Sequence, residues 1–455
     1  MEEINLEELS FEKDDLLNRR QIAINLTNII KNKSNLNVLA IDSSWGTGKT
    51  TFINKWIDML NNDANYKDQF STLYFNAWKN DYIKDPFMAL MTEIKLNTSS
   101  DFKEAFKNAM TVGEKICKST LNVSLKLATA GALGIKDIVD DELKDSVLKC
   151  IIDEKNNREE FIENLESLAC EDKKIIFFID EIDRCRPTFA IELLEVIKHL
   201  FSAKNIFFVI SLDKEQLSHS IKTIYGENMD SQGYLRRFFD LEYLLPNSHL
   251  KTYIDFKLKE LDTNLINLKY IKTFLTEIFT SEDYTLRDIE KAVPFIELLL
   301  LNVDYFTKNP EGTKWNEYYL LVTSYLYSFI IDLKIKHPSL LKDLLNCNYE
   351  DNSSGFSRFK KFDLEKFNLT SYGFSNELAK SVLKDVLDIF LKLNLLVSKT
   401  SIENVISTQG DRYIVGKKLR NNPGYEWGCS VDLTTYFKDE NIIEKLYFTE
   451  QFSIS

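Results

Sequence analysis

The chain has 455 residues, which is too long for a single hydrophobic core and predicts two or three domains. Apolar residues make up 44% of the chain and aromatic residues 12%, so we expect a folded globular protein. The formal net charge of −13 argues against a broad footprint for nonspecific nucleic-acid binding.

Cysteine usage and the N-terminus indicate a cytoplasmic protein. The six cysteines and four histidines show no spacing typical of a metal site, so we expect free thiols in a reducing compartment. The N-terminus, M-E-E-I-N-L-E-E-L, lacks the basic and apolar regions of a signal peptide. The best candidate for a membrane span, 121–135, is shorter than the required ~20 residues and contains Lys126, so we expect no membrane partner.

A strand, a phosphate-binding loop and a helix are predicted for residues 38–56, V-L-A-I-D-S-S-W-G-T-G-K-T-T-F-I-N-K-W. This order is typical of a P-loop. Gly46 and Gly48 allow positive φ, so backbone N–H groups can surround a phosphate. The motif G-x-x-x-x-G-K-[ST] has Ser43 in place of its first glycine, which tightens the turn but removes no phosphate ligand.

Each residue of this loop has an expected part in binding ATP. Lys49 would reach the β- and γ-phosphates, and Thr50 would hold Mg²⁺. The helix that begins here directs its positive end toward the anion. The nucleotide-binding residues expected in the loop are Trp45, Gly46, Thr47, Gly48, Lys49, Thr50 and Thr51.

Residues 1–36 precede the loop and carry apolar side chains at helical spacing. In many P-loop ATPases the segment before the first strand closes over the base of the nucleotide. Arg19 or Arg20 could therefore lie near the nucleotide, and Arg19 is our candidate. A solvated helix start explains both arginines equally well.

Two features separate the loop from the second half of the site. Residues 71–79, S-T-L-Y-F-N-A-W-K, predict a second strand, and Pro86 is typical of the first turn of a helix. Residues 101–172 are rich in Lys, Glu, Leu and Ile and predict a helical insertion.

A second cluster of candidate residues follows in 173–186, K-K-I-I-F-F-I-D-E-I-D-R-C-R. Residues 175–179 predict a strand buried on both faces, and the acids come where it ends. Ligands of open parallel sheets bind at that carboxyl edge. Asp180 is therefore expected to hold Mg²⁺ and Glu181 to polarise the attacking water, although an acidic strand end is common without either function.

The next elements add further polar groups. Residues 187–201 predict a helix and 205–212 a buried strand, whose end places Ser211 and Asp213 beside the expected γ-phosphate. A short strand is predicted at 241–245. Before it, residues 234–240 predict an exposed helix that carries Arg236 and Arg237.

From residue 247 onward the pattern is almost entirely helical, with breaks at 309–310 and 337–338. We therefore predict an α/β fold with a parallel-sheet P-loop core and a mainly α-helical C-terminal region. The predicted domains are the core at 1–246 with its insertion at 101–172, a helical lid-like domain at 247–345, and a mostly helical domain of unassigned role at 346–455.

Three motifs in order resemble the KAP family of P-loop NTPases, in the STAND and AAA-like branch. They are S-S-W-G-T-G-K-T-T-F at 43–52, Y-F-N-A-W-K-N-D-Y at 74–82 and F-F-I-D-E-I-D-R-C-R-P at 177–187. The resemblance covers roughly residues 10–300. Many relatives carry transmembrane helices between the Walker motifs, whereas the insertion at 101–172 has no convincing span, so a soluble member is expected.

The resemblance implies roles for individual residues. Lys49 and Thr50 would form the Walker A pair and Asp180 the Walker B acid. Asp183 and Arg184 occupy the family's D-x-x-D-R pattern. Residues 285–288 resemble the segment in which relatives place a sensor 2 arginine, which makes Arg287 a candidate γ-phosphate contact.

Two functions remain open from the sequence. The first is a Mg²⁺-dependent ATPase, in which Lys49, Thr50, Asp180 and Glu181 position and neutralise the phosphates. The second is a slowly hydrolysing, ATP-dependent switch or scaffold that recruits a partner through its C-terminal region. A nucleic-acid translocase is disfavoured by the acidic balance.

An arginine that completes the site is missing from the local motifs. The candidates are Arg184, Arg186, Arg236 and Arg237, and we favour Arg236 or Arg237 acting on the nucleotide of a neighbouring copy in a homo-oligomer. Family members resemble bacterial proteins implicated in exclusion of phage. The resemblance therefore implies an anti-phage role, with a protein effector or a phage-derived trigger as partner.

Overall fold

The computed structural model divides the chain into two compact units, Met1–Ser248 and His249–Ser455, which we call the first and second units. The predicted division at 246 lies beside this boundary. Most of the insertion at 101–172 and almost all of the predicted domain at 346–455 lie outside the described residues. The structure describes residues 9–33, 36–97, 173–200, 205–247, 249–261, 268–281, 284–301 and 314–345, short stretches between 107 and 164, and the pairs 414–415 and 431–432.

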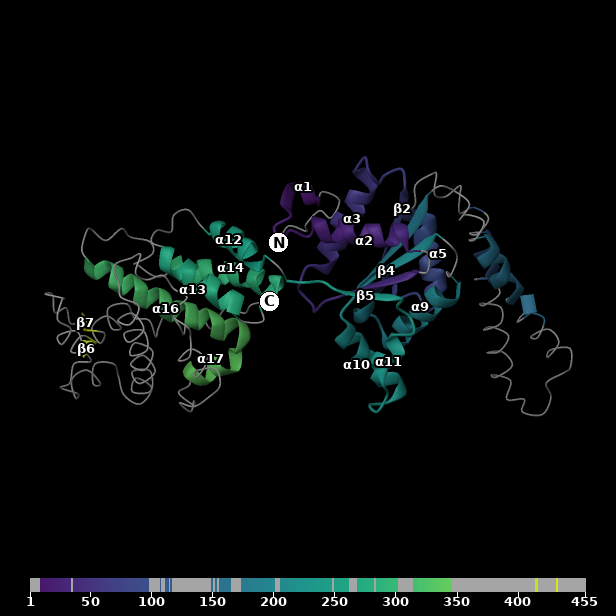
Figure 1. Ribbon diagram of the computed structural model, residues 1–455. Coiled ribbons are helices and arrows are strands. Elements are labelled where there is room, and N and C mark those ends of the chain that lie inside the picture. The colour runs from purple at the N-terminus through teal and green to yellow at the C-terminus, as the bar shows by residue number, and fades with distance from the viewer. Residues whose placement is uncertain are drawn as a thin grey trace. The chain divides into compact units, whose positions relative to one another are not determined.

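The first unit is built on a five-stranded parallel sheet in the order β2-β3-β4-β1-β5 (Figure 1). Because the strands are parallel, their carboxyl ends meet at one edge, where Asn76 aligns with Asp180 and Asp42 with Leu212. The strands are β1 (Val38–Asp42), β2 (Phe70–Asn76), β3 (Lys174–Asp180), β4 (Ile206–Leu212) and β5 (Leu241–Leu244).

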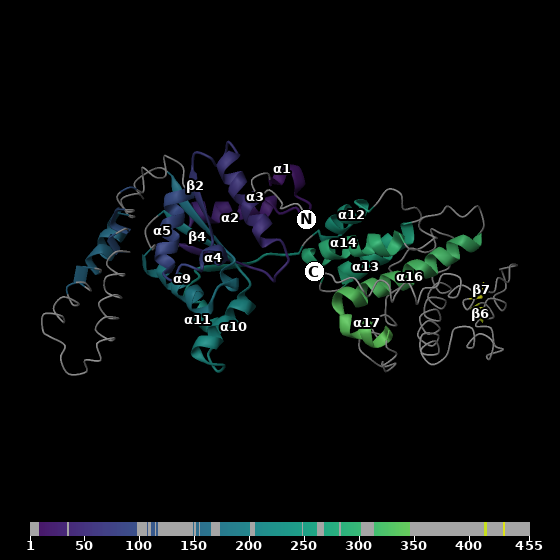
Figure 2. The same cartoon turned by 180° about the vertical axis from the view of Figure 1, so that it is seen from behind.

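Helices cover both faces of this sheet, so its central strands are apolar along most of their length (Figures 1 and 2). One face packs against α1 (Phe11–Asp14), α2 (Arg20–Asn32) and α3 (Lys49–Asn62). The opposite face packs against α5 (Pro86–Asn97), α9 (Pro187–Leu200), α10 (Lys214–Tyr225) and α11 (Ser231–Leu235). The predicted fold class, a parallel-sheet P-loop core, is confirmed.

Trp56 on α3 anchors one of these faces. It is fully buried, and its ring meets that of Phe178 on β3 edge-on at 5.3 Å. Its indole Nε1 donates a hydrogen bond to the Thr27 hydroxyl of α2 at 2.9 Å, and that hydroxyl donates to the Ala23 carbonyl at 2.7 Å. Thr27 thereby satisfies the buried indole and ties α2 to α3.

Two predicted boundaries in the first unit are wrong. The strand predicted at 71–79 ends at Asn76 and α4 (Ala77–Asn80) follows, because the Asn76 side chain accepts a hydrogen bond from the Lys79 N–H and caps this helix. The helix predicted at 234–240 ends at Leu235 instead. Its helix, α11, starts earlier because the Asp230 side chain caps it at Gly233.

The described part of the second unit is mainly helical, with one short antiparallel strand pair, β6 (Ile414–Val415) and β7 (Val431–Asp432). It contains α12 (Leu250–Lys259), α13 (Lys269–Ser281), α14 (Leu286–Leu301), α16 (Lys314–Lys336) and α17 (Pro338–Leu345). The break predicted at 337–338 is present, since Pro338 begins a new helix. Among the described residues, no helix combines the length and the apolar character that a membrane span requires.

We predict that Thr27→Val destabilises the first unit by about 1–3 kcal/mol, because it leaves the buried Trp56 indole N–H without an acceptor. Urea unfolding followed by tryptophan fluorescence measures this. Thr27→Ser is the matched control, since it keeps the hydroxyl and should lose clearly less stability. Equal losses in the two variants would contradict the assigned hydrogen bond.

Candidate functional site

The loop between β1 and α3 has the backbone of an anion-binding turn. Gly46 and Gly48 have φ of 79° and 81°, in the left-handed region that favours glycine. Ser43 does not have positive φ, so its side chain causes no backbone strain. Its hydroxyl instead donates to the Thr47 hydroxyl at 2.8 Å, which donates in turn to the Ser44 carbonyl at 2.8 Å. Serine therefore fits the position and braces the loop.

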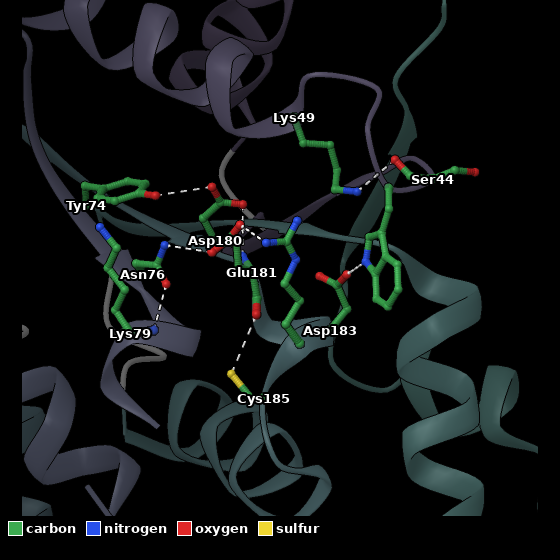
Figure 3. A network of polar contacts seen from close by, with 11 residues as sticks. Ser44, Lys49, Tyr74, Asn76, Lys79, Asp180, Glu181, Asp183 and Cys185 are labelled. Carbon is green, nitrogen blue, oxygen red and sulfur yellow. Dashed lines mark hydrogen bonds and ion pairs between the residues drawn. The ribbon is translucent and has the colours of Figure 1, made fainter. Parts of the chain in front are cut away.

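Lys49 begins α3 and directs its ammonium into this loop. The Nζ donates to the carbonyls of Ser43 and Ser44, the latter at 3.1 Å (Figure 3). Burial lowers the pKa of Lys49, and nearby carboxylates, Asp183 first and Asp213 next, oppose the shift. Lys49 is thus buried, with its ammonium against the carbonyls of the loop.

Arg19 supports the loop from behind. Arg19 is 3% exposed, and its guanidinium donates to the Thr47 carbonyl at 3.0 Å, to that of Gly48 at 3.5 Å and to that of Pro246 at 3.0 Å. Burial lowers the pKa of Arg19 to about 10, which leaves it charged at neutral pH. Arg20 instead pairs with Asp63 at 3.2 Å and Glu12 at 3.4 Å, away from the loop.

Asp180 lies at the end of β3 and is almost completely buried. It accepts hydrogen bonds from the Tyr74 hydroxyl at 3.2 Å and from the Glu181 N–H at 2.9 Å (Figure 3). Burial raises the pKa of Asp180, and the hydroxyls of Thr50 and Ser211 oppose this shift. This carboxylate thus has neighbours from three elements: Tyr74 of β2, Ser211 of β4 and Thr50 of α3.

Glu181 follows in the left-handed conformation, with φ of 60° and ψ of 28°, which costs on the order of 1 kcal/mol or more for a residue with a Cβ. Its Oε2 accepts a hydrogen bond from the Asn76 amide at 3.0 Å, and its Oε1 pairs with Arg184 at 2.6 Å. The Arg184 guanidinium also lies 5.5 Å from the Trp78 ring centroid. Glu181 is therefore held on both sides by side chains of the same sheet edge.

Trp45 connects the loop to two other strand ends. Its backbone N–H donates to Asp213 Oδ2 at 3.1 Å, and its indole N–H donates to Asp183 Oδ2. Asp183 is buried, which raises its pKa, and the Trp45 hydrogen bond and the charge of Lys49 oppose the shift. Lys49, Trp45, Asp183 and Asp213 thus form one connected polar cluster.

The remaining arginine candidates lie in different surroundings. Arg186 pairs with Asp81 at 3.5 Å, so it is engaged, as Arg184 is. Arg236 and Arg237 are both exposed immediately after α11. Thr51 is half-buried in the first turn of α3.

Arg287 is exposed in the first turn of α14 in the second unit, and a polar network holds that turn. The Thr285 N–H donates to Asp288 Oδ2 at 3.0 Å, and the Asp288 N–H donates to the Thr285 hydroxyl at 3.2 Å, which together cap the helix. Lys336 at the end of α16 adds an ion pair to Asp288 at 2.7 Å. The turn that carries Arg287 is therefore rigidly built.

Sequence reasoning assigned no role to Asn76 or Tyr74, although both lie in a motif that it noticed. The available signal was their position, because a polar residue at the end of a strand beside β3 must face the acids that end β3. Arg184 is a candidate arginine for the nucleotide, whereas the structure pairs it with Glu181 at the i, i+3 spacing of a helical turn, which is the signal the sequence carried.

The strand order, the glycine-bent loop before α3 and the acids that end β3 define a P-loop NTPase fold. The sequence matches the KAP family P-loop domain over residues 19–300, which is more than half of the chain. The chain belongs to the KAP family, and nucleotide binding is the property that its P-loop domain supports. No curated protein matches the sequence.

Solved structures give more distant matches. The Aeropyrum pernix ORC2 protein, solved as ADPNP–ADP complexes, has 12% identity and a TM-score of 0.35 over 82% of this chain and 95% of its own. AMPPCP-bound DnaA from Aquifex aeolicus has 14% identity and a TM-score of 0.33 over 87% and 98%. A DNA replication initiation factor has 14% identity and a TM-score of 0.32 over 97% of each chain. At these scores the likeness carries no argument about activity.

We predict that Arg19→Met weakens nucleotide binding by about tenfold, or about 1.4 kcal/mol, because the loop carbonyls of Thr47 and Gly48 lose their charged donor. Titration with a fluorescent ATP analogue measures the dissociation constant. Arg20→Met is the matched control, because it removes the same charge from the neighbouring residue and leaves the loop contacts intact. A similar loss of affinity in both variants would contradict the assigned support.

Proposed function

We propose that this protein is a Mg²⁺-dependent ATPase that couples ATP binding and hydrolysis to a conformational or assembly change. The observation that carries the proposal is the meeting of the Lys49 loop with Asp180 and Glu181 at one sheet edge. The Thr50 hydroxyl lies close enough to Asp180 to affect its pKa, so the two expected metal-binding residues are neighbours.

The residues fit the nucleotide and the metal. Positive φ at Gly46 and Gly48, together with the amino end of the 14-residue helix α3, suits a phosphate chain. The Thr50 hydroxyl and the Asp180 carboxylate offer the oxygen ligands that Mg²⁺ prefers. Bound magnesium would neutralise charge on the β- and γ-phosphates. Lys49 would then exchange its loop carbonyls for phosphate oxygens.

Glu181 is the proposed group that orients the attacking water and takes its proton. Asn76 and Arg184 fix its carboxylate at the edge of the site, and Figure 3 shows the contact between Asn76 and Glu181 beside Asp180. Ser211, buried at the end of β4 beside Asp180, is the proposed polar contact near the γ-phosphate. Preorganised groups of this kind lower the barrier because they need not reorient during the reaction.

A homo-oligomer would complete the site with an arginine. Arg184 and Arg186 are engaged with Glu181 and Asp81, whereas Arg236 and Arg237 are exposed on the surface. We therefore propose that Arg236 or Arg237 reaches the nucleotide of a neighbouring copy. Arg287 is a further candidate, supplied by the second unit.

A slowly hydrolysing switch is the second candidate, and the contacts of Glu181 favour it. Both carboxylate oxygens of Glu181 are engaged, one by the Asn76 amide and the other by Arg184. Each oxygen keeps a further lone pair, but the ion pair with Arg184 is lost when the carboxylate takes a proton from water, which makes that step less favourable. ATP binding without rapid turnover would then be the signalling state.

The partner is proposed from the family alone. An effector protein or a phage-derived trigger that binds the C-terminal region would give the ATPase a role in anti-phage defence. Neighbouring genes give a direct test, since an adjacent nuclease or deaminase would support a two-part system.

We predict that Glu181→Gln lowers kcat for ATP by at least about 100-fold and leaves nucleotide affinity within about threefold of the wild type, because glutamine keeps the size of the side chain and one acceptor oxygen but cannot take the proton. Lys49→Ala should lose binding as well. Phosphate release and native mass with and without ATP measure both. A turnover-driven protein loses its biological activity in Glu181→Gln, whereas a switch becomes locked on. Absence of any nucleotide-dependent change in the wild type would refute the proposal.

A second prediction concerns the arginine supplied by a neighbouring copy. The double variant Arg236→Ala/Arg237→Ala should lose most turnover but keep nucleotide binding. Mixing it with Glu181→Gln should restore part of the rate, because a mixed oligomer contains one interface with both groups intact. Lys67→Ala, which removes an exposed charge just before β2, should keep the wild-type rate. A mixture no more active than its components would count against a trans arginine.

A further inference from the structure

Trp45 is attached to the ends of two different strands. Its backbone N–H donates to Asp213, which follows β4, and its indole N–H donates to Asp183, which comes shortly after β3. Asp213 is itself fixed, because it caps α10 at the Gln216 N–H at 3.2 Å. A single residue of the phosphate loop is therefore held by the two strands that border the site.

The turn after β3 places Asp183 and Glu181 on different sides. Glu181 has φ of 60°, and the chain then enters the short 3₁₀ helix Ile182–Arg184. Glu181 meets Asn76 on one side, whereas Asp183 lies on the side of Lys49 and Ser44 (Figure 3). Only two peptide units separate these residues, so the position of Asp183 constrains the backbone at Glu181.

The Trp45–Asp183 contact requires a buried carboxylate, which is an unfavourable way to hold two segments together if the contact serves packing alone. Asp183 is 6% exposed, and its second oxygen, Oδ1, is buried without a hydrogen-bond partner among the described residues. Burying a carboxylate costs more than burying an apolar side chain of similar size, and the Trp45 donor and the charge of Lys49 offset part of that cost. Apolar packing does not explain the tryptophan either, since 42% of it is exposed. The indole N–H is the feature that the contact uses.

We propose that the Trp45–Asp183 hydrogen bond is the mechanical link between the phosphate loop and the acids of β3. Phosphate binding to the loop fixes Trp45, which through Asp183 fixes the turn that carries Glu181. Trp45 and Asp183 are thus positioning residues that act through Glu181. The expected effect on kcat rests on the proposed ATPase function. The expected ordering of the turn after β3 when nucleotide binds does not.

Hydrogen–deuterium exchange of the full chain with ATPγS tests the structural consequence. In the wild type, ATPγS should slow exchange in the loop peptide 43–50 and also in the peptide 179–186. Trp45→Phe keeps an aromatic ring but loses the N–H donor, and Asp183→Ala loses the acceptor. Both variants should keep loop protection and lose the protection of 179–186. Asp183→Asn, which retains an acceptor oxygen, should restore it.

Kinetics supply a second readout that a purely structural role would not change. Trp45→Phe and Asp183→Ala should each lower kcat by about 10–100-fold, with the ATPγS dissociation constant within about threefold of the wild type. The double variant should be no worse than either single variant, because both remove the same link. Asp183→Asn, which keeps an acceptor for the indole N–H but not the charge beside Lys49, should have a clearly higher kcat than Asp183→Ala.

The outcomes separate this inference from the proposed function. The link would be overturned if ATPγS protects peptide 179–186 of Trp45→Phe as strongly as that of the wild type. It would also be overturned if ATPγS protects only peptide 43–50 in the wild type. Loss of loop protection in Trp45→Phe would also overturn it, because Trp45 would then support the loop itself. If ATPγS slows exchange in 179–186 of a wild-type protein that hydrolyses no ATP, the proposed ATPase activity is refuted and the Trp45–Asp183 link stands.

Discussion

The buried charge of Lys49 is the constraint on which the rest of the first unit depends. Burial lowers the pKa of this ammonium, and four carboxylates oppose that effect: Asp183, Asp213, Asp180 and Asp42. They come from the ends of β1, β3 and β4, which meet only because the strands are parallel and adjacent. The strand order therefore places these carboxylates around Lys49. Another order would leave the buried ammonium without nearby negative charge.

The same carboxylates outnumber the positively charged side chains of the described residues that face the site. Arg19 is occupied with loop carbonyls behind the site, and Arg184 pairs with Glu181. A phosphate chain adds further negative charge, so binding it requires cations from outside this cluster. A magnesium ion supplies part of them, and an arginine from a neighbouring copy would supply more. The acid-rich edge thus explains why the proposed function includes both a metal and an oligomer.

Much of the fold could be predicted because its signals are local. Buried strands appear as apolar runs, the glycines at 46 and 48 mark a backbone with positive φ, and acids after β3 mark the binding edge. Element ends were less predictable because capping decides them. Asn76 ends β2 since its side chain caps α4, and a run of aromatic residues gives no sign of this.

The sequence by itself determined the fold class, the family and the residues of the phosphate loop, because each depends on spacing within a short stretch of chain. Only the tertiary structure decided which side chains support them. Arg19 lies 28 residues before Thr47, and Asp183 lies 138 residues after Trp45, and both pairs meet because the sheet brings their elements together. Contacts across such separations are set by packing and strand order, which no local pattern encodes.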